Sequence, residues 1–328
     1  MKLDKKELYN NEVSFDASML SPRYFLSWIG MGLLYLISLL PIQLQLFLGK
    51  LIGWTLYISG THRKKIVEVN LKLCFPNKTE EERKEMVKGV FKDMGKGLLE
   101  TGIAWWRSDK FIEKLITKKS NFELLDEVNE GCIILLKHST HAELDIRMTS
   151  SLIKAGGMYK NQTNKVMNYL MIKARNKYLI GTVTNRQTRR GIRFLKNGLK
   201  FLYAADQDYG TKGAEFVPFF GVPAATVTLP LDLFKKGTKV FFFNVMRAGS
   251  SYEITLEEIS SKAKEENFLT LMNETYEKAI LKTPTQYFWM HRRFKNRPEG
   301  EEGFYPYWKK REKRREKERN KRAKNLKP

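Results

Sequence analysis

The segment Ile133-Ile134-Leu135-Leu136-Lys137-His138-Ser139-Thr140-His141-Ala142-Glu143 carries the strongest structural signal in the chain. A short apolar run that ends in a histidine predicts a buried strand with a reactive side chain directly after it. In an α/β protein the carboxyl end of a strand holds such a group rigidly and leaves it open to substrate. We therefore predict that His138 is a general base and that Glu143 fixes its tautomer and stabilises its charged form.

Two neighbouring patterns compete with this pair. His141 and Asp145 are four residues apart, a spacing that on a helix suits a capping or salt-bridge role. Ser139 next to His138 would suit a covalent acyl-serine mechanism, but adjacent side chains on an extended segment point to opposite sides. Further along, His291 lies in an arginine-rich run, where we expect it to be structural or to contact a substrate.

From about residue 120 onward, predicted strands alternate with predicted helices, which indicates an α/β fold with a central, mostly parallel sheet flanked by helices. The expected strands are 132–136, 179–184, 200–205, 240–246 and an edge strand at 252–256. The expected helices are 141–155, ended by Gly156-Gly157, and 165–178, 187–197, 224–236 and 267–281. Residues 62–118 look helical, with a capping box formed by Thr79 and Glu82.

A charge-free run from Tyr24 to Gly49 precedes this domain. It is long enough to cross a bilayer, although Pro41 interrupts it. We expect a membrane anchor, either one spanning helix or a helix with an interfacial half. The chain thus divides into a polar segment at 1–20, an anchor at 21–60, a catalytic domain at 61–308 and a basic tail at 309–328.

The chain is strongly basic, with 59 Lys and Arg against 36 Asp and Glu, a net charge of +23. Such a charge favours anionic partners. The two cysteines, Cys74 and Cys132, do not form a metal-binding pattern, and their small number indicates a reducing compartment without a disulfide. We expect neither a metal nor a cofactor.

Several segments, in the same order, closely resemble the bacterial lipid A late acyltransferases, most of all the lauroyl type, within the lysophospholipid acyltransferase-like superfamily. The resemblance runs from about residue 20 to residue 308. The segments that carry it are Ser21-Pro22-Arg23-Tyr24-Phe25-Leu26-Ser27-Trp28, Asn70-Leu71-Lys72-Leu73-Cys74-Phe75-Pro76, Gly97-Leu98-Leu99-Glu100-Thr101-Gly102, Asp206-Gln207-Asp208-Tyr209-Gly210, Phe216-Val217-Pro218-Phe219-Phe220 and Gln286-Tyr287-Phe288-Trp289-Met290-His291-Arg292-Arg293.

The resemblance implies a glycerolipid acyltransferase-like fold and a catalytic histidine followed, after four residues, by Asp or Glu. Here these are His138 and Glu143. It implies an acyl carrier protein thioester as donor and a hydroxyl of Kdo2-lipid IVA as acceptor. The reducing compartment and the basic composition favour a catalytic domain on the cytoplasmic face of the bacterial inner membrane, against an anionic surface. The chain departs from the family at Lys160, where an arginine is usual.

Five further residues are candidates for substrate binding. Arginine side chains suit phosphate groups, and Arg175 and Arg186 match family residues that face the active-site groove. Arg189 lies on the same stretch, and a solvated basic face is the alternative for all three. Asp206 and Asp208 follow a predicted strand and are expected to position sugar or arginine groups, unless they only stabilise a turn.

Two other functions stay open. A lysophospholipid acyltransferase would use the same chemistry on a glycerolipid acceptor. A membrane-tethered nucleic-acid-binding protein would use the basic composition and the tail for phosphate contacts. The chain has no recognisable nucleic-acid-binding motif, so we expect no nucleic acid partner.

Overall fold

A seven-stranded sheet forms the centre of the computed structural model, which describes residues 13–126 and 128–305. The strand order is β1-β9-β8-β2-β5-β3-β4, and every neighbouring pair is parallel except β8 and β9. The predicted α/β class with a mostly parallel sheet is therefore confirmed. The basic tail at 309–328 and most of the polar segment at 1–20 lie outside the described residues.

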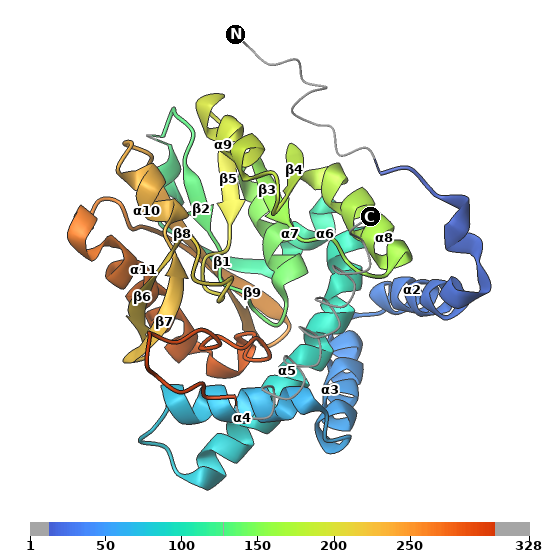
Figure 1. Cartoon of the computed structure of the whole chain (residues 1–328). Helices are drawn as coiled ribbons and strands as arrows, with labels where there is room; N and C mark the ends of the chain where they lie inside the picture. Colours follow the sequence, from blue (N-terminus) through green and yellow to red (C-terminus); the bar gives the residue numbers. More distant parts are fainter. Residues whose placement is uncertain (1–12, 127, 306–328) are drawn as a thin grey trace, which may run out of the picture.

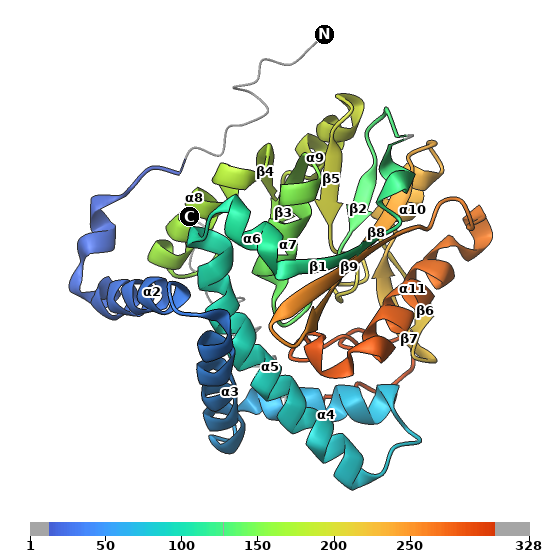
Figure 2. The same ribbon diagram turned by 180° about the vertical axis from the view of Figure 1, so that it is seen from behind.

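The strands and helices follow one another along the chain as shown in Figures 1 and 2. The sheet strands are β1 (Ile116–Ser120), β2 (Ile133–Leu135), β3 (Ala155–Tyr159), β4 (Gly181–Thr184), β5 (Lys200–Tyr203), β8 (Val240–Ala248) and β9 (Ser251–Glu258), and a separate antiparallel ribbon is made of β6 (Ala214–Phe219) and β7 (Val222–Val227). The helices are α2 (Phe25–Ser38), α3 (Ile42–Ile58), α4 (His62–Cys74), α5 (Glu80–Trp106), α6 (Asp109–Leu115), α7 (Ala142–Leu152), α8 (Lys165–Tyr178), α9 (Thr188–Lys196), α10 (Leu229–Phe234) and α11 (Phe268–Lys282).

Alternate residues of the strands face two different cores. Ile133 and Leu135 of β2 belong to the core formed with α4, α10, α11 and the first half of α5, while Ile134 belongs to the core formed with the second half of α5, α7 and α8. Figure 1 shows these helices on the two sides of the sheet. Because β2 is buried on both faces, its sequence is a continuous apolar run, as is usual for a parallel strand.

The sheet topology brings two loops together. Strand β2 pairs with β5 in parallel, with Leu135 opposite Tyr203, so the two strands end at the same edge of the sheet. His138 follows β2, and Asp206 follows β5. A third segment joins them, since Ser139 forms an antiparallel bridge with Tyr287. Residues from three distant parts of the chain therefore meet at this edge.

The charge-free N-terminal run forms two helices rather than one. Helix α2 ends at Ser38 and α3 begins after Pro41, because proline has no N–H to continue the first helix. The Gln45 side chain donates to the carbonyls of Ser38 and Leu40 and so satisfies the end of α2. Among the described residues, none of the helices combines the length and the apolar character needed to cross a bilayer. The single spanning helix, one of the two expected forms of the anchor, is therefore absent from this part of the chain.

Helix α3 packs against the long helix α5 through glycines. A Cβ atom on Gly53 would lie 2.1 Å from the carbonyl oxygen of Phe91, and one on Gly95 would lie 2.0 Å from that of Gly49. Two residues further, a Cβ on Gly97 would lie 1.8 Å from the carbonyl oxygen of Thr140. Helix α5 therefore contacts α3 and the loop after β2 by direct backbone approach.

The sequence interpretation was wrong at several elements. The expected end of the first helix, Gly156-Gly157, lies inside β3, where a Cβ on Gly156 would meet the Phe194 ring at 2.7 Å. Glycine is needed there because α9 packs directly on the strand. The expected helix at 224–236 begins within strand β7, and only Leu229–Phe234 of it is helical, as the short α10. The expected edge strand is β9, which is covered by β1. The capping box of Thr79 and Glu82 is confirmed.

Candidate active site

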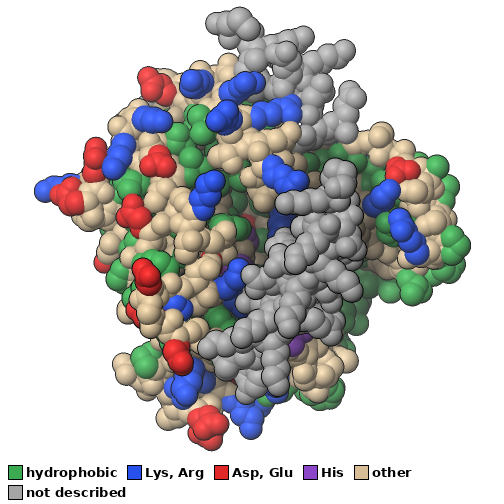
Figure 3. All heavy atoms as spheres, viewed as in Figure 1, with side chains coloured by type: hydrophobic (Ala, Val, Ile, Leu, Met, Phe, Trp, Pro, Cys, Tyr) green, Lys and Arg blue, Asp and Glu red, His purple; other side chains and the backbone are tan. Residues whose placement is uncertain are grey.

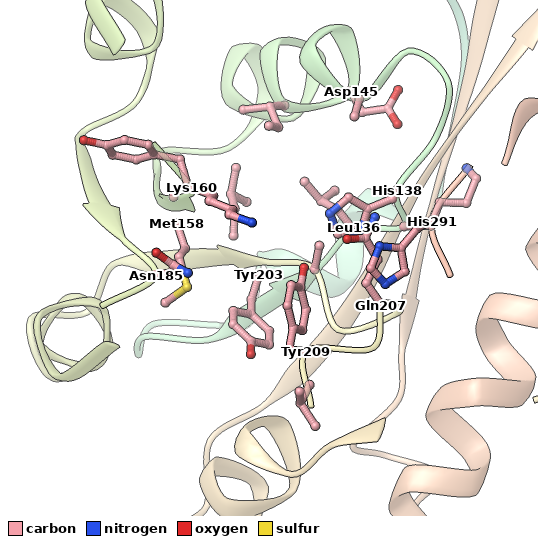
Figure 4. A pocket seen from close by; sticks show the side chains of 18 of the residues that line it. Leu136, His138, Asp145, Met158, Lys160, Asn185, Tyr203, Gln207, Tyr209 and His291 are labelled. Carbon is pink, nitrogen blue, oxygen red and sulfur yellow. The ribbon is translucent and has the colours of Figure 1, made fainter. Parts of the chain in front are cut away.

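A pocket of about 730 Å³ opens at the carboxyl edge of the sheet, where β2, β3 and β5 end. Figure 4 shows that His138, Gln207 and His291 lie together at one end, while Met158, Lys160 and Asn185 lie at the other. The apolar part of the wall contains Leu136, Ile146, Gly157, Met158, Met171, Leu179 and Leu202. The pocket therefore holds two histidines at one end and has apolar side chains along its wall.

His138 is held by the carboxylate of Asp206. Its ring Nδ1 lies 2.5 Å from Oδ1 of Asp206, and its backbone N–H donates to Oδ2 at 2.7 Å. Asp206 has no exposed surface, whereas the His138 side chain is 28% exposed. Burial opposes ionisation of Asp206, but the hydrogen bonds and positive charge of His138 outweigh it, so the pKa of Asp206 lies below its usual value. An ionised carboxylate only accepts hydrogen bonds, so Nδ1 of His138 carries a proton and Nε2 is left as the base.

Glu143 does not occupy the place that the sequence interpretation gave it. It lies in the first turn of α7, where its carboxylate accepts hydrogen bonds from Arg175 Nη2 at 2.5 Å and Nε at 3.2 Å, and from Trp105 Nε1 at 3.0 Å. The carboxylate that orients His138 is therefore Asp206. The physical reason is that the start of α7 turns Glu143 towards α5 and α8, and away from the end of β2.

Arg175 of α8 lines the pocket as expected, but it is paired rather than free. Burial opposes its charged form, but Glu143 outweighs this effect, so the pKa of Arg175 is raised. The bidentate pair fixes the guanidinium in one orientation at the pocket wall.

Ser139, His141 and Asp145 form a separate buried cluster. Ser139 Oγ donates to Asp145 at 2.6 Å, and His141 Nδ1 lies 2.5 Å from the same carboxylate. His141 is 1% exposed and Ser139 is 2% exposed. Their burial agrees with a structural role and excludes direct contact with a bulky substrate by either side chain.

The two aspartates proposed for substrate binding are both buried. Asp206 is occupied by His138, which corrects its expected role. The carboxylate of Asp208 accepts hydrogen bonds from the backbone N–H groups of Gly210 and Asn296 and from the Asn296 side chain. The alternative interpretation, a turn stabilised by aspartate, is therefore the better description of Asp208, although this residue also lines the pocket.

Arg186 and Arg189 are exposed and lie at the start of α9. Their neighbours Asn185 and Thr188 line the pocket, so the two arginines lie close to it. Lys160, Lys295 and the fully buried Lys137 also line it. Figure 3 shows several Lys and Arg side chains over this part of the surface. Their charge suits an anionic substrate.

The sequence predicts that His291 is structural or contacts a substrate, and Figure 4 shows it next to His138. The backbone carbonyl of His138 accepts from the Phe288 N–H at 2.9 Å, which aligns the two segments. No periodic pattern connects residues so far apart in the sequence. In the described residues, we find no group of three or more His, Cys, Asp or Glu side chains arranged to hold a metal ion.

Comparison with known proteins shows which family the chain resembles. Residues 12–296 match the family model described as bacterial lipid A biosynthesis acyltransferase. The chain is 33% identical over 306 residues to the lipid A biosynthesis palmitoleoyltransferase of Escherichia coli K12, covering 90% of this chain and 99% of the relative. It is also 33% identical over 300 residues to the lipid A biosynthesis lauroyltransferase of the same organism, covering 88% and 98%.

Among solved structures, the chain is similar to the 1-acyl-sn-glycerophosphate acyltransferase PlsC from Thermotoga maritima, with a TM-score of 0.39 and 13% identity, covering 74% of this chain and 98% of that one. A similarity this low supports no conclusion about fold or function. The family match and the two bacterial relatives span nearly the whole chain. By these matches, the chain belongs to the bacterial lipid A biosynthesis acyltransferase family.

Proposed function

We propose that the protein transfers a fatty acyl chain from an acyl carrier protein thioester to a hydroxyl group of Kdo2-lipid IVA, with a laurate-like chain as the preferred donor. The proposal rests mainly on the His138–Asp206 pair, which lies beside a pocket with an apolar wall. A base beside a hydrocarbon-lined cavity suits the attack of an alcohol on a fatty thioester.

The chemistry needs a single base. Nε2 of His138 removes the proton of the acceptor hydroxyl while the oxygen attacks the thioester carbonyl carbon. The new C–O bond forms, the C–S bond breaks, and the proton on His138 passes to the departing thiolate. Asp206 keeps the proton of the ring on Nδ1 and stabilises the imidazolium that forms.

The remaining residues of the site support binding of two anionic substrates. Arg175, fixed by Glu143, and the exposed Arg186 and Arg189 are suited to the phosphates of the acceptor or the acidic surface of the donor. In this proposal Glu143 acts through Arg175 as a positioning residue. The apolar wall formed by Met158, Met171, Leu179 and their neighbours would take the acyl chain.

The exposed apolar face of α2 and α3 supports membrane binding at the cytoplasmic side of the inner membrane. On α2 the side chains of Leu26, Ile29, Leu33 and Leu36 are each 50% exposed or more, as are Phe47, Trp54 and Ile58 on α3. Figure 3 shows apolar side chains at the right edge of the molecule, where α2 lies. We propose that the two helices lie in the membrane interface, which would give the pocket access to a lipid acceptor.

A transfer assay tests the function. Purified protein is incubated with acyl carrier protein thioesters of 10 to 16 carbons and, separately, with Kdo2-lipid IVA or lysophosphatidic acid as acceptor. The proposal predicts acylation of the disaccharide, with greatest kcat/KM for the 12-carbon donor, and loss of transfer in His138→Ala. Transfer to lysophosphatidic acid alone would select the glycerolipid alternative. A preference for 16-carbon donors would replace the laurate assignment and keep the reaction.

A further inference from the structure

The loop at residues 206–210 fixes the proton positions of two histidines, not one. Its first residue, Asp206, accepts from Nδ1 of His138. Two residues later, the backbone N–H of Asp208 donates to Nε2 of His291 at 3.2 Å. A nitrogen that accepts a hydrogen bond has no proton, so in the neutral ring of His291 the proton is on Nδ1. The two rings therefore have opposite roles: His138 presents a lone pair, and His291 presents an N–H.

His291 is rigidly placed. Its backbone carbonyl accepts from the Asn70 side chain at 2.8 Å, and its ring is held by the Asp208 N–H. Asp208 is in turn fixed through its carboxylate by Asn296. In the part of the chain that the structure describes, the Nδ1 atom has no hydrogen-bond partner, and the residue lines the pocket. A hydrogen-bond donor that is already fixed in place does not have to move during the reaction. Such a donor is well suited to stabilise a negative charge that develops beside it.

His291 also stays uncharged beside a group that becomes charged. Burial, together with the charge of His138, lowers the pKa of His291 from its ordinary value of 6.5 to about 4. At neutral pH it therefore neither suppresses the basicity of His138 nor repels the imidazolium that forms. Nε2 of His291 already accepts a hydrogen bond from Asp208, and Nδ1 carries the proton. His291 therefore has no free lone pair with which to act as a second base.

We propose that His291 is a second catalytic histidine, whose Nδ1–H donates a hydrogen bond to the carbonyl oxygen of the acyl thioester as that oxygen becomes negative. The inference rests on the proposed acyl transfer. When the acceptor oxygen attacks, the π electrons of the carbonyl move onto its oxygen, and the N–H of His291 stabilises that charge. The hydrogen bond is released when the carbonyl forms again and the thiolate leaves, so His291 neither gains nor loses a proton.

Two substitutions separate this role from a structural one. In His291→Gln, the side-chain amide reaches the position of Nε2, so its oxygen can accept from the Asp208 N–H, but the donor at Nδ1 is lost. In His291→Asn, the amide reaches the position of Nδ1 and keeps a donor there, but the acceptor for Asp208 is lost. A purely structural histidine would tolerate Gln better than Asn, whereas an oxyanion donor would tolerate Asn better than Gln.

The full-length variants are assayed with the acyl carrier protein thioester and Kdo2-lipid IVA, and their unfolding transitions are compared with that of the wild type. We expect kcat of His291→Gln to fall on the order of 10²–10³-fold with little change in KM, as for loss of one oxyanion donor. We expect His291→Asn to stay within about 10-fold of the wild type, because it keeps a neutral donor.

A His291→Gln variant that is no more impaired than His291→Asn would overturn the proposal. If the Gln variant does not fold, His291→Asn is compared with His291→Ala, since both lack the acceptor and only Asn keeps a donor. Equal activity of these two would also overturn it. Absence of transfer by the wild type would instead refute the proposed function, and the role of His291 with it.

Discussion

Nδ1 of His138 lies 2.5 Å from Oδ1 of Asp206, although the two residues are 68 positions apart in the sequence. The pair exists because β2 and β5 are parallel neighbours in the sheet and end at the same edge. The other oxygen of Asp206 accepts from the His138 backbone N–H. One carboxylate thus fixes both the main chain and the ring of the base.

The substitution Asp206→Asn should put the proton of His138 on the wrong nitrogen. The amide oxygen of the new side chain has to accept from the backbone N–H of His138, so its NH2 group faces Nδ1 of the ring. Nδ1 must then accept a hydrogen bond, and the ring proton moves to Nε2. We expect kcat to fall by about 10²–10⁴-fold, as when the orienting aspartate of a hydrolase triad becomes asparagine. Steady-state kinetics measures this, with the exposed Asp232→Asn as the matched control. A loss of less than about 10-fold would contradict the assigned role of Asp206.

The Glu143–Arg175 pair should show a non-additive effect on stability. Glu143→Leu leaves a buried guanidinium without its partner, which costs about 3 kcal/mol of unfolding free energy. Replacing both residues, as Glu143→Leu with Arg175→Met, removes the unpaired charge and should recover part of this loss. Urea unfolding of the two single variants and the double variant tests the coupling. Simple addition of the two single effects would show that the pair is not coupled.

The lowered pKa of His291 predicts a pH dependence of stability. The unfolded chain binds a proton at this residue below pH 6.5, whereas the folded protein does so only below about 4. Stability is therefore lost as pH falls between these values. His291→Gln removes this term, so its unfolding free energy relative to the wild type should rise by about 2 kcal/mol between pH 7.5 and pH 4.5. Denaturant unfolding at the two pH values measures the difference, and a constant difference would be inconsistent with a neutral His291.

The exposed side chains of α2 and α3 should govern membrane binding. Replacing Leu26, Leu33 and Trp54 together by serine removes apolar surface worth about 1.5–3 kcal/mol for each side chain when fully buried. Because interfacial burial is partial, we expect a loss of on the order of 10²-fold in partitioning to vesicles of anionic phospholipid. Leu281→Ser, which is equally exposed on α11, is the control and should leave partitioning unchanged. Vesicle sedimentation that shows the same partitioning for the triple variant and the wild type would rule out this surface.

The order of the strands limits what the sequence alone could predict. The apolar run before His138 and the one before Asp206 each predict a strand that ends in a polar side chain, and both predictions are confirmed. Neither run carries information on which strands are neighbours. Glu143 was therefore assigned to His138 because it was near in sequence, while the actual partner came from the adjacent strand.

Other errors came from tertiary contacts that overrode local preference. Glycines usually end helices, but Gly156 lies within β3 because the Phe194 ring occupies the space of its missing side chain. The segment at 224–236 has few strand cues, yet Val222–Val227 pairs with β6 in an antiparallel ribbon. No local pattern predicts that His291 lies beside His138, because the two segments are aligned by contacts between distant parts of the chain.

The glycine contacts of α5 have a consequence for how a lipid reaches the reaction centre. The backbones of α3 and α5 are in direct contact where the two helices cross, and so are the backbones of Gly97 and Thr140. At these contacts no side chains lie between the two backbones that could rearrange. If α2 and α3 rest on a bilayer, the height of His138 above the lipid headgroups is then set by the fold itself. We expect little bending at this junction, because the backbones are in direct contact there. The acceptor lipid would have to rise out of its leaflet by a fixed amount, and changing the length of α3 would change that amount.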